Sequence, residues 1–522
     1  MPVGEQDLSG AVLGRRTVLA AALGGGAALL GGWGIQRWRG AAAPITHGGG
    51  HVGPAVNVDA AAVARVEAAR AHSGRTTAVE LVARRATVDL GGTTVEALTY
   101  GGELPGAPVR LRAGDLAQVS ITNELDGETS VHWHGLALRH DADGVPGVTG
   151  PAIAAGSRAA VSFVVPDPGT YWLHPHTGLQ LDWGLSAPVI VEDPREPGRY
   201  DSELVVMLDD WTVGLGKTPE QLLAELLAGG GSMGGMGGMG GMGSMGGMGG
   251  MGGGSGMSDS GDVAYPAYLA NGRLPTAPRS VTARPGARVR IRLINAAADT
   301  TFDVALGGHR LTVTHSDGFP VKPVTVDTLQ LGMGERYDVT VTLGDGVFPL
   351  TAVPTGKSGT AARVLIRTAS GSAPSPGLRP AELDGRRLAL NDLVAADAVR
   401  WPARTPDSEQ PVALAGSMGD YRWTVNGRTY ADAEPLTVRE GQLTRLRITN
   451  HSMMLHPVHL HGHTFAVRGV AGAPRKDTVV VPAMAALDVD VLADNPGAWM
   501  LHCHNAFHME AGMMTRLDYV RS

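Results

Sequence analysis

The residues most able to do chemistry are histidines arranged in pairs with one residue between them. His-x-His occurs five times, whereas chance placement of 18 His among 522 residues predicts roughly 0.6 such pairs. The pairs are His132/His134, His174/His176, His459/His461, His461/His463 and His502/His504. Residues i and i+2 of a strand point to the same face, so each pair can direct two imidazoles at one metal ion. Neutral imidazole suits copper, which makes copper binding the first hypothesis.

The one cysteine, Cys503, lies between the two histidines of the last pair. On a strand its side chain points to the opposite face from theirs, so its thiolate can bind a separate ion there. His508 and Met513 follow at five and ten positions, and His456 precedes the third pair by three. Two His, one thiolate and a distant Met are the ligands of a type 1 electron-transfer copper. A single cysteine also excludes a disulfide framework within the chain.

A motif that occurs three times must position these residues. Each copy has Arg-x-Gly, an alternating run and then Asn, with the Gly and the Asn nine positions apart. The copies span Arg112 to Asn123, Arg284 to Asn295 and Arg439 to Asn450. The runs alternate with period two, as half-buried strands do. Three copies of one β-motif predict three homologous β domains.

The histidine pairs belong to the outer two copies only. Nine residues past the Asn, the first and third copies have His-x-His-Gly, whereas the middle copy has Val304-Ala305-Leu306-Gly307. Five residues past a later Gly, the middle copy has Thr351-Ala352-Val353 in place of the second pair. The outer domains therefore supply eight ligands, enough for three copper ions if the two domains face each other. At the positions of Cys503, His508 and Met513 the first domain has Pro175, Gln180 and Leu185, so only the third domain can build a type 1 site.

We predict an all-β protein of three consecutive Greek-key β-sandwich domains, over residues 75–195, 196–372 and 373–522. The abundance of Gly (75) and Pro (33) suits loop-rich β domains. Residues 44–74 are expected to be a flexible leader. In the middle domain a short helix is predicted to start at Thr218-Pro219-Glu220, with Thr as its cap and Pro in its first turn. The leucines at 222, 223, 226 and 227 are expected on one face, and Gly229 should end the helix.

A low-complexity insertion follows this helix, over residues 229–261. From Ser232 to Met257 it consists of Gly with regularly spaced methionines, at Met233, Met236, Met239, Met242, Met245, Met248, Met251 and Met257. So much Gly cannot hold a helix or strand, which predicts a flexible segment. The thioether of Met is a soft ligand that selects Cu(I). A repeat expansion without a role is the alternative.

The N-terminus, over residues 1–43, resembles a twin-arginine export signal. Arg15-Arg16 precede an apolar, Gly/Ala-rich run that extends to about Ile35. The alternative is a chance Arg pair before a membrane anchor. We therefore expect a periplasmic, cell-envelope or extracellular protein. The net charge of -7 gives no reason to expect a nucleic-acid partner, and a monomer is the expected oligomeric state.

Four motifs of this chain resemble, in order, the copper motifs of multicopper oxidases. They are His-Trp-His-Gly, His-Pro-His, His-Pro-Val-His-Leu-His-Gly and His-Cys-His-x3-His-x4-Met, and the resemblance covers about residues 75–522. It implies cupredoxin-like domains with four copper ions: one type 1, one type 2 and two type 3. By this likeness the type 1 ligands are His456, Cys503, His508 and Met513. The type 2 ligands are His132 and His459, and the type 3 ligands are His134, His174, His176, His461, His502 and His504.

The resemblance also implies a reaction. A donor gives single electrons to the type 1 copper, and four electrons reduce O2 to two waters at the other three ions. Asp143, in Asp143-Gly144-Val145-Pro146-Gly147, stands where the family places a proton-relaying carboxylate; a plain Asp-Gly turn is the alternative. A second family acid normally follows the type 1 His directly. Here Met509 occupies that position, and Glu510 comes one residue later.

The methionine segment resembles the Met-rich inserts of bacterial cuprous oxidases that act in copper tolerance. Met454, shortly before His456, also stands where these enzymes bind substrate copper, although Ser452 replaces one of their carboxylates. Oxidation of Cu(I) is therefore the first hypothesis for the substrate. A laccase-like oxidase of phenols with an incidental Met-rich loop is the second, since an exposed type 1 edge accepts many donors. A copper-sequestering protein without enzymatic activity is the third.

Overall fold

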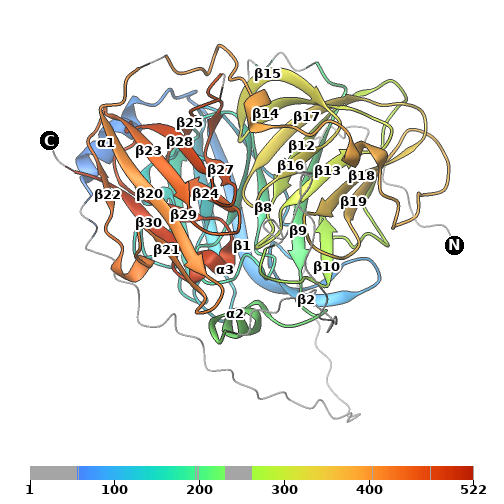
Figure 1. Cartoon of the computed structure of the whole chain (residues 1–522), viewed down its shortest axis with the longest axis horizontal. Helices are drawn as coiled ribbons and strands as arrows, with labels where there is room; N and C mark the ends of the chain where they lie inside the picture. Colours follow the sequence, from blue (N-terminus) through green and yellow to red (C-terminus); the bar gives the residue numbers. More distant parts are fainter. Residues whose placement is uncertain are drawn as a thin grey trace, which may run out of the picture. The chain divides into compact units, whose positions relative to one another are not determined.

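The computed structural model describes residues 56, 58–193, 196, 199–229, 261–402, 404–470 and 472–520. These residues form short strands in six sheets, two for each of the three sequence repeats (Figure 1). The predicted all-β class is therefore confirmed. The predicted export signal over residues 1–43 and the methionines from Met233 to Met257 lie outside the described residues.

The first domain consists of strands β1 to β8, whose apolar side chains share one core. One sheet has the spatial order β2 (Thr94–Tyr100), β1 (Thr76–Asp89), β4 (Leu116–Asn123), β6 (Arg158–Val164). The other has the order β3 (Val109–Arg112), β8 (Ala187–Glu192), β7 (Gly169–His174), β5 (His132–His134). The histidine pairs of this domain thus lie on β5 and at the end of the neighbouring strand β7, with His176 two residues beyond β7.

The middle domain consists of strands β9 to β19. Its six-stranded sheet has the order β10 (Ala267–Ala270), β9 (Ser202–Trp211), β12 (Arg288–Asn295), β17 (Arg336–Thr342), β14 (Leu311–Ser316), β15 (Phe319–Val326). Its five-stranded sheet has the order β11 (Ser280–Thr282), β19 (Ala362–Arg367), β18 (Val347–Pro354), β13 (Phe302–Leu306), β16 (Leu329–Leu331). Strands β13 and β18 correspond to the histidine-bearing strands of the first domain, and they carry apolar residues and Thr351 instead.

The third domain, strands β20 to β30, repeats the same plan. One sheet has the order β21 (Arg422–Val425), β20 (Ser408–Ser417), β23 (Leu443–Asn450), β28 (Ala486–Leu492), β25 (Phe465–Val467), β26 (Arg475–Lys476). The other has the order β22 (Leu436–Val438), β30 (Met514–Tyr519), β29 (Ala498–Cys503), β24 (His456–Leu460), β27 (Thr478–Val481). In each domain the strand after the repeated Gly runs parallel to the domain's first strand: β4 to β1, β12 to β9 and β23 to β20.

The repeated Asn has the same structural role in all three copies. Its side-chain oxygen accepts the backbone N–H two residues later, at Leu125, Ala297 and Ser452. Its side-chain nitrogen donates to carbonyls four or five residues later and at a second loop. The Asn therefore ends the strand in a fixed turn. This turn sets the start of the next segment, which in the outer domains carries the first histidine pair.

Few helices are present among the described residues. They are α1 (Ala60–Ala69), α2 (Pro219–Leu227), α3 (Ala506–Glu510) and the 3-10 turns η1 (His140–Ala142), η2 (Ala381–Asp384), η3 (Leu390–Asp392) and η4 (Tyr430–Asp432). Helix α2 begins as predicted, with a capping box between Thr218 and Gln221. Leu226 is buried, but Leu227 is half exposed, so the predicted apolar face is narrower than four leucines. No helix in the described part of the chain is long and apolar enough to span a membrane.

Helix α1 lies within residues 44–74, where a flexible leader was expected. The Asp59 side chain caps it by accepting the N–H groups of Ala61 and Ala62. Glu67 accepts the N–H of Val164, at the end of β6, and Arg70 donates to the carbonyl of Ala137. These bonds attach α1 to the first domain, so the leader prediction does not hold for this part.

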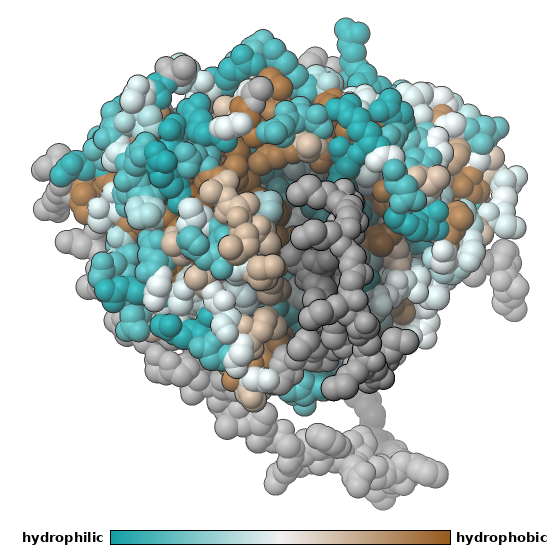
Figure 2. Space-filling view, viewed as in Figure 1, coloured by the Kyte–Doolittle hydropathy of each residue, from teal (hydrophilic) through white to brown (hydrophobic). Residues whose placement is uncertain are grey.

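The surface of the protein carries both hydrophilic and apolar residues. Figure 2 shows hydrophilic residues spread over the visible face, with apolar residues in groups between them. Only six large apolar side chains are classed as exposed among the described residues, and three of them are methionines: Met418, Met453 and Met484.

Candidate metal centre

The eight histidines of the two outer domains gather in one place, here called the histidine cluster. Its members are His132, His134, His174, His176, His459, His461, His502 and His504. Strand pairing aligns them, since His132 lies opposite His174 across β5 and β7, and His459 lies opposite His502 across β24 and β29. The first and third domains meet ring to ring. The ring centroids of His132 and His461 are 3.8 Å apart, as are those of His134 and His459.

Backbone carbonyls orient four of these rings by accepting a hydrogen bond from the Nδ1 atom. The Nδ1 atoms of His132, His174, His459 and His502 lie 3.2, 3.0, 2.9 and 2.9 Å from the carbonyl oxygens of Asp143, Pro175, Asp477 and Cys503. A carbonyl oxygen only accepts, so each Nδ1 carries the proton and each Nε2 presents a lone pair. The buried Nε2 atoms of His132, His174 and His459 have no hydrogen-bond partner among the described residues. Such orphaned acceptors fit a bound metal ion.

Two further contacts support the same conclusion. The Nε2 atoms of His461 and His502 lie 3.0 Å apart, although the Nδ1 of each ring already donates to an oxygen. Two facing lone pairs repel unless a cation lies between them. His134 is turned the other way: its Nε2 lies 3.1 Å from the Thr478 hydroxyl, and its buried Nδ1 has no partner. The residues present therefore fit a metal cluster held by neutral imidazoles.

Burial keeps these rings uncharged. Burial, and secondarily the neighbouring His459 and His132 rings, lowers the pKa of His502 from its usual 6.5 to about 3. Burial also lowers the pKa of five other cluster rings well below the usual value, namely His134, His174, His176, His461 and His504. Neutral imidazole is the form that binds a metal ion.

The copper-free protein is expected to lose stability in acid. From pH 6.5 down to about 3 the unfolded chain protonates a residue such as His502 while the folded chain does not. The unfolded state therefore binds more protons, and the free energy of unfolding falls as the pH falls through this window. The loss is roughly 1.4 kcal/mol per pH unit for each such ring. Thermal unfolding of metal-free protein across this window measures the effect, and an unchanged Tm would contradict it.

A second group of ligand atoms lies on the other face of strand β29. It consists of His456, Cys503 and His508 and is here called the Cys503 group. The Cys503 Sγ lies 3.6 Å from His456 Nδ1 and 3.7 Å from His508 Nδ1, and the two Nδ1 atoms are 3.2 Å apart. All three residues are fully buried, and so is Met513. As predicted, the thiol and its flanking histidines serve two different groups.

Oxygen atoms contact the Nε2 atoms of both histidines of the Cys503 group, which are the ring nitrogens not directed at the sulfur. The Ser452 hydroxyl lies 2.7 Å from His456 Nε2, and the Asp262 carboxylate lies 2.8 Å from His508 Nε2. Burial opposes charge on His508, but the Asp262 carboxylate raises the pKa of this ring to about 10. Metal binding at its Nδ1 must therefore displace a proton in the neutral pH range. Because both histidines are fully buried, the exposed edge expected for this site is not present in the described structure.

Asp143 lies between the two outer domains at the histidine cluster. Its carboxylate oxygens lie 3.1 Å from His132 Nδ1 and 2.9 Å from His461 Nδ1, and the residue is fully buried. One carboxylate thus holds a ring from each outer domain. Asp143 is also the C-cap of η1, so the turn that the alternative proposed exists as well. Glu510 ends α3 and is half-buried, outside every group of close ligand atoms found among the described residues.

Several site residues were not identified from the sequence. Asp262 contacts His508 from 246 positions away, and Ser452 was considered only as a departure from a family pattern. Asp477 and Thr478, which contact His459, had no sequence signal beyond their place after the third histidine motif. His463 received no role, and it hydrogen-bonds locally to the Tyr519 hydroxyl, at 2.7 Å.

Both described ends of the methionine insertion lie at one hairpin beside the Cys503 group. Asp262, just after the insertion, also accepts a hydrogen bond from the Tyr421 hydroxyl, 2.5 Å away. Gly229, its first residue, lies near Gly419, since a β-carbon on Gly229 would be in van der Waals contact with the Gly419 carbonyl oxygen, at 3.4 Å. Both contacts are to the hairpin between β20 and β21. The ring of Trp423, on β21, packs against His508 with centroids 3.9 Å apart.

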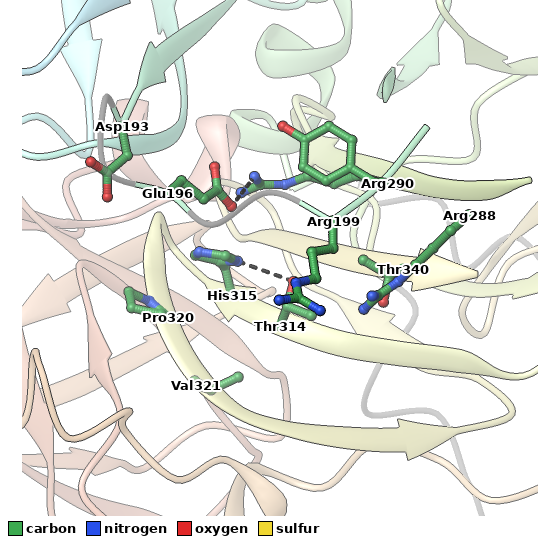
Figure 3. A pocket seen from close by; sticks show the side chains of 11 residues that line it. Asp193, Glu196, Arg199, Arg288, Arg290, Thr314, His315, Pro320, Val321 and Thr340 are labelled. Carbon is green, nitrogen blue, oxygen red and sulfur yellow. Dashed lines mark hydrogen bonds and ion pairs between the residues drawn. The ribbon is translucent and has the colours of Figure 1, made fainter. Parts of the chain in front are cut away.

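A separate cavity lies in the middle domain. It has a volume of about 410 Å³ and is lined by side chains that include Arg290, Glu196 and His315. Figure 3 shows Arg290 paired with Glu196 and His315 directed at Thr314. No member of the histidine cluster or the Cys503 group lines it.

Comparisons with known proteins agree with this geometry. Sequence models described as multicopper oxidase match residues 82–196, 202–370 and 403–521, which include every member of both ligand groups. The chain is 48% identical to the multicopper oxidase MmcO of Mycobacterium tuberculosis, over 88% of this chain and 90% of that protein. It is 28% identical to a copper resistance protein A homolog of Pseudomonas syringae pv. tomato, over 84% and 91%. The solved laccase of Botrytis aclada has a TM-score of 0.70 and 26% identity, over 87% and 89%.

Proposed function

Since the chain belongs to the multicopper oxidase family, we propose that it couples the one-electron oxidation of Cu(I), and of phenolic donors, to the four-electron reduction of O2 to water. Copper tolerance is the proposed role. The observation that carries the proposal is the position of Cys503 between His502 and His504, on a strand with a ligand group on each face. The peptide chain itself thereby connects an electron-accepting site with an O2-reducing site.

We propose four copper ions. The type 1 site would use His456, Cys503 and His508, with the buried Met513 as the distant ligand; the type 2 site His132 and His459; and the type 3 pair His134, His174, His176, His461, His502 and His504. Bound copper would accept single electrons from the donor and deliver four of them to O2. The backbone carbonyl of Cys503 accepts the Nδ1–H of the His502 ring. The residue that would bind type 1 copper thereby also orients one ring of the histidine cluster. Burial of both groups excludes water from the connecting strand.

Asp143 is the proposed proton relay. Its carboxylate contacts the outer nitrogens of His132 and His461 and can pass a proton inward while holding both rings. Glu510, at the end of α3, is the second candidate for proton transfer.

The proposed substrate class follows from what surrounds the Cys503 group. Met453 and Met484 are 69% and 64% exposed. Met453 follows Ser452 in the chain, and the backbone N–H of Met484 donates to the Ser452 carbonyl. The Ser452 hydroxyl contacts one type 1 histidine, His456, and the Asp262 carboxylate contacts the other. Soft thioethers select Cu(I). Met454 and the methionines of the insertion are proposed to capture Cu(I) at the same end.

Replacing the eight methionines from Met233 to Met257 with serine should impair Cu(I) oxidation selectively. Without the thioethers the local supply of Cu(I) is lost, and kcat/KM for Cu(I) should fall about 10-fold or more. Oxidation of a dimethoxyphenol should stay unchanged. A deletion of Ser232–Met257 serves as the second variant, because it removes the bulk of the segment as well and should leave phenol oxidation equal or faster. O2 uptake by copper-loaded protein measures both activities.

Equal losses for both donors, or no loss for either, would contradict a copper-delivery role. In the second case a laccase-like oxidase with an incidental loop is the better description. The similarity to laccases favours this second candidate, whereas a copper-sequestering protein does not need an internal connection between two buried ligand groups. The resemblance of residues 1–43 to a twin-arginine export signal supports the further proposal that the protein acts in the periplasm, the cell envelope or outside the cell.

A further inference from the structure

A turn of the middle domain packs directly on the histidine cluster. Gly334, between β16 and β17, has φ +83°, and a β-carbon there would lie 2.9 Å from His504 Cδ2 and 3.0 Å from His134 Cε1. Only glycine allows this approach. The domain without a metal-ligand motif therefore contacts one ring from each of the two domains that have them.

Arg336, two residues after Gly334 and the first residue of β17, adds a buried charge to this contact between domains. Arg336 is fully buried, and its two terminal nitrogens donate to the two carboxylate oxygens of Asp477, at 2.7 and 2.6 Å. Its Nε donates to the carbonyl of Thr170, at 3.1 Å. One guanidinium thus bonds to the first and third domains at once. The fit is close, because a β-carbon at Gly135 would lie 2.4 Å from Arg336 Nη2.

Asp477 and Thr478 carry this contact to the cluster. The carbonyl of Asp477 accepts the N–H of His459, and the Thr478 hydroxyl donates to Asp477 Oδ1 at 2.8 Å. The same hydroxyl lies 3.1 Å from His459 Nδ1 and 3.1 Å from His134 Nε2. His134 and His459 are stacked, with their planes 13° apart. A change at Arg336 therefore reaches two rings through two side chains.

A gain in stability does not by itself explain why charged groups are buried around Arg336. Lys476 lies 3.1 Å from both Asp317 and Glu335, and Asp317 lies 3.7 Å from Arg336. Five charged groups are thus buried together. Buried ion pairs are often no more stable than apolar packing of the same volume, whereas their bidentate geometry is directional. Orientation of the histidines is the role that this geometry serves best.

We propose that Arg336 is a positioning residue for the histidine cluster, and that the middle domain thereby sets how the rings of the two outer domains face the bound copper. The proposal requires copper at the cluster but does not depend on which donor the enzyme oxidises. Residues that orient metal ligands typically change activity or affinity by about 10- to 100-fold when they are replaced.

Arg336→Lys in the copper-loaded protein tests this, since it keeps the charge but loses the fork that binds both oxygens of Asp477. We expect kcat for O2 reduction to fall about 10-fold or more with KM for the donor unchanged. The electron paramagnetic resonance signal of the cluster copper should change, while the blue absorption of the type 1 site stays the same. Arg290→Lys is the matched control, because Arg290 is also buried and ion-paired. It pairs with Glu196 (Figure 3) and with Asp338. It should leave the cluster signal unaltered.

Thr478→Val provides an independent test if Arg336→Lys fails to fold. It removes the hydroxyl that links the ion pair to His134 and His459 and leaves the ion pair in place. The same change in the cluster signal is expected. A parental cluster signal and a parental kcat in whichever of these two variants folds with its full copper content would overturn the proposal. A signal change of equal size in Arg290→Lys would also overturn it.

Discussion

Cys503→Ser is expected to abolish O2 reduction with every electron donor. The Cys503 Sγ is the only thiol sulfur in the chain and lies 3.6 and 3.7 Å from the two Nδ1 atoms of its group. A serine hydroxyl does not provide a soft anionic ligand, so type 1 copper should be lost together with its blue absorption. O2 uptake, visible absorption and copper content per chain measure the outcome.

The histidine cluster should keep its copper in this variant, because no cluster nitrogen is replaced. Met513→Leu is a suitable comparison, since the first domain has Leu185 at the corresponding position. A weak distant ligand tunes the site without being essential, so this variant should remain blue and active at a changed rate. Turnover by Cys503→Ser at a measurable fraction of the parental rate would exclude the proposed entry route for electrons.

Asp143→Asn is expected to lower kcat by about 10- to 100-fold. The amide is similar in size to the carboxylate but cannot accept and release a proton, and it weakens the hold on His132 Nδ1 and His461 Nδ1. If Asp143 relays protons, the deficit should grow as the pH rises, because solvent then supplies fewer protons. O2 uptake as a function of pH, with copper content measured in parallel, gives the answer.

Asp141→Asn is the matched control for this prediction. Asp141 lies two residues away, is exposed and pairs with Arg139 at the surface. Its replacement should leave kcat unchanged. If Asp143→Asn keeps its copper and behaves like Asp141→Asn at every pH, the relay is wrong and the Asp-Gly turn explains this residue. If copper is lost instead, Asp143 acts by holding the two rings.

Features of the fold that depend on residues close together in the chain could be predicted from the sequence. The Arg-x-Gly and Asn landmarks predicted three domains because each performs the same backbone task, as Asn123 and Asn295 show with matching hydrogen bonds. The i, i+2 rule placed Cys503 on the opposite face from its neighbours. Helix α1 also had a local signal, Asp59 before an alanine-rich run, which composition alone obscured.

Contacts between distant residues could not be predicted in this way. Arg336 and Asp477 are 141 positions apart, and Asp262 and His508 are 246 apart. A charged residue far from a motif resembles any surface residue in the sequence, since only the folded chain decides whether it becomes buried. The contact of His508 with Asp262 likewise depends on packing from the middle domain, which no pattern within the third domain reveals.

The stacked rings of His134 and His459 also constrain biosynthesis. His134 leaves the ribosome more than three hundred residues before His459, and His502 and His504 follow later still. The nascent chain therefore has only the first domain's half of the cluster ligands until the third domain has been synthesised. Contacts this distant in sequence form late in folding. The complete copper cluster can therefore assemble only after the third domain has packed against the first, and a chain that ends before His502 cannot form it.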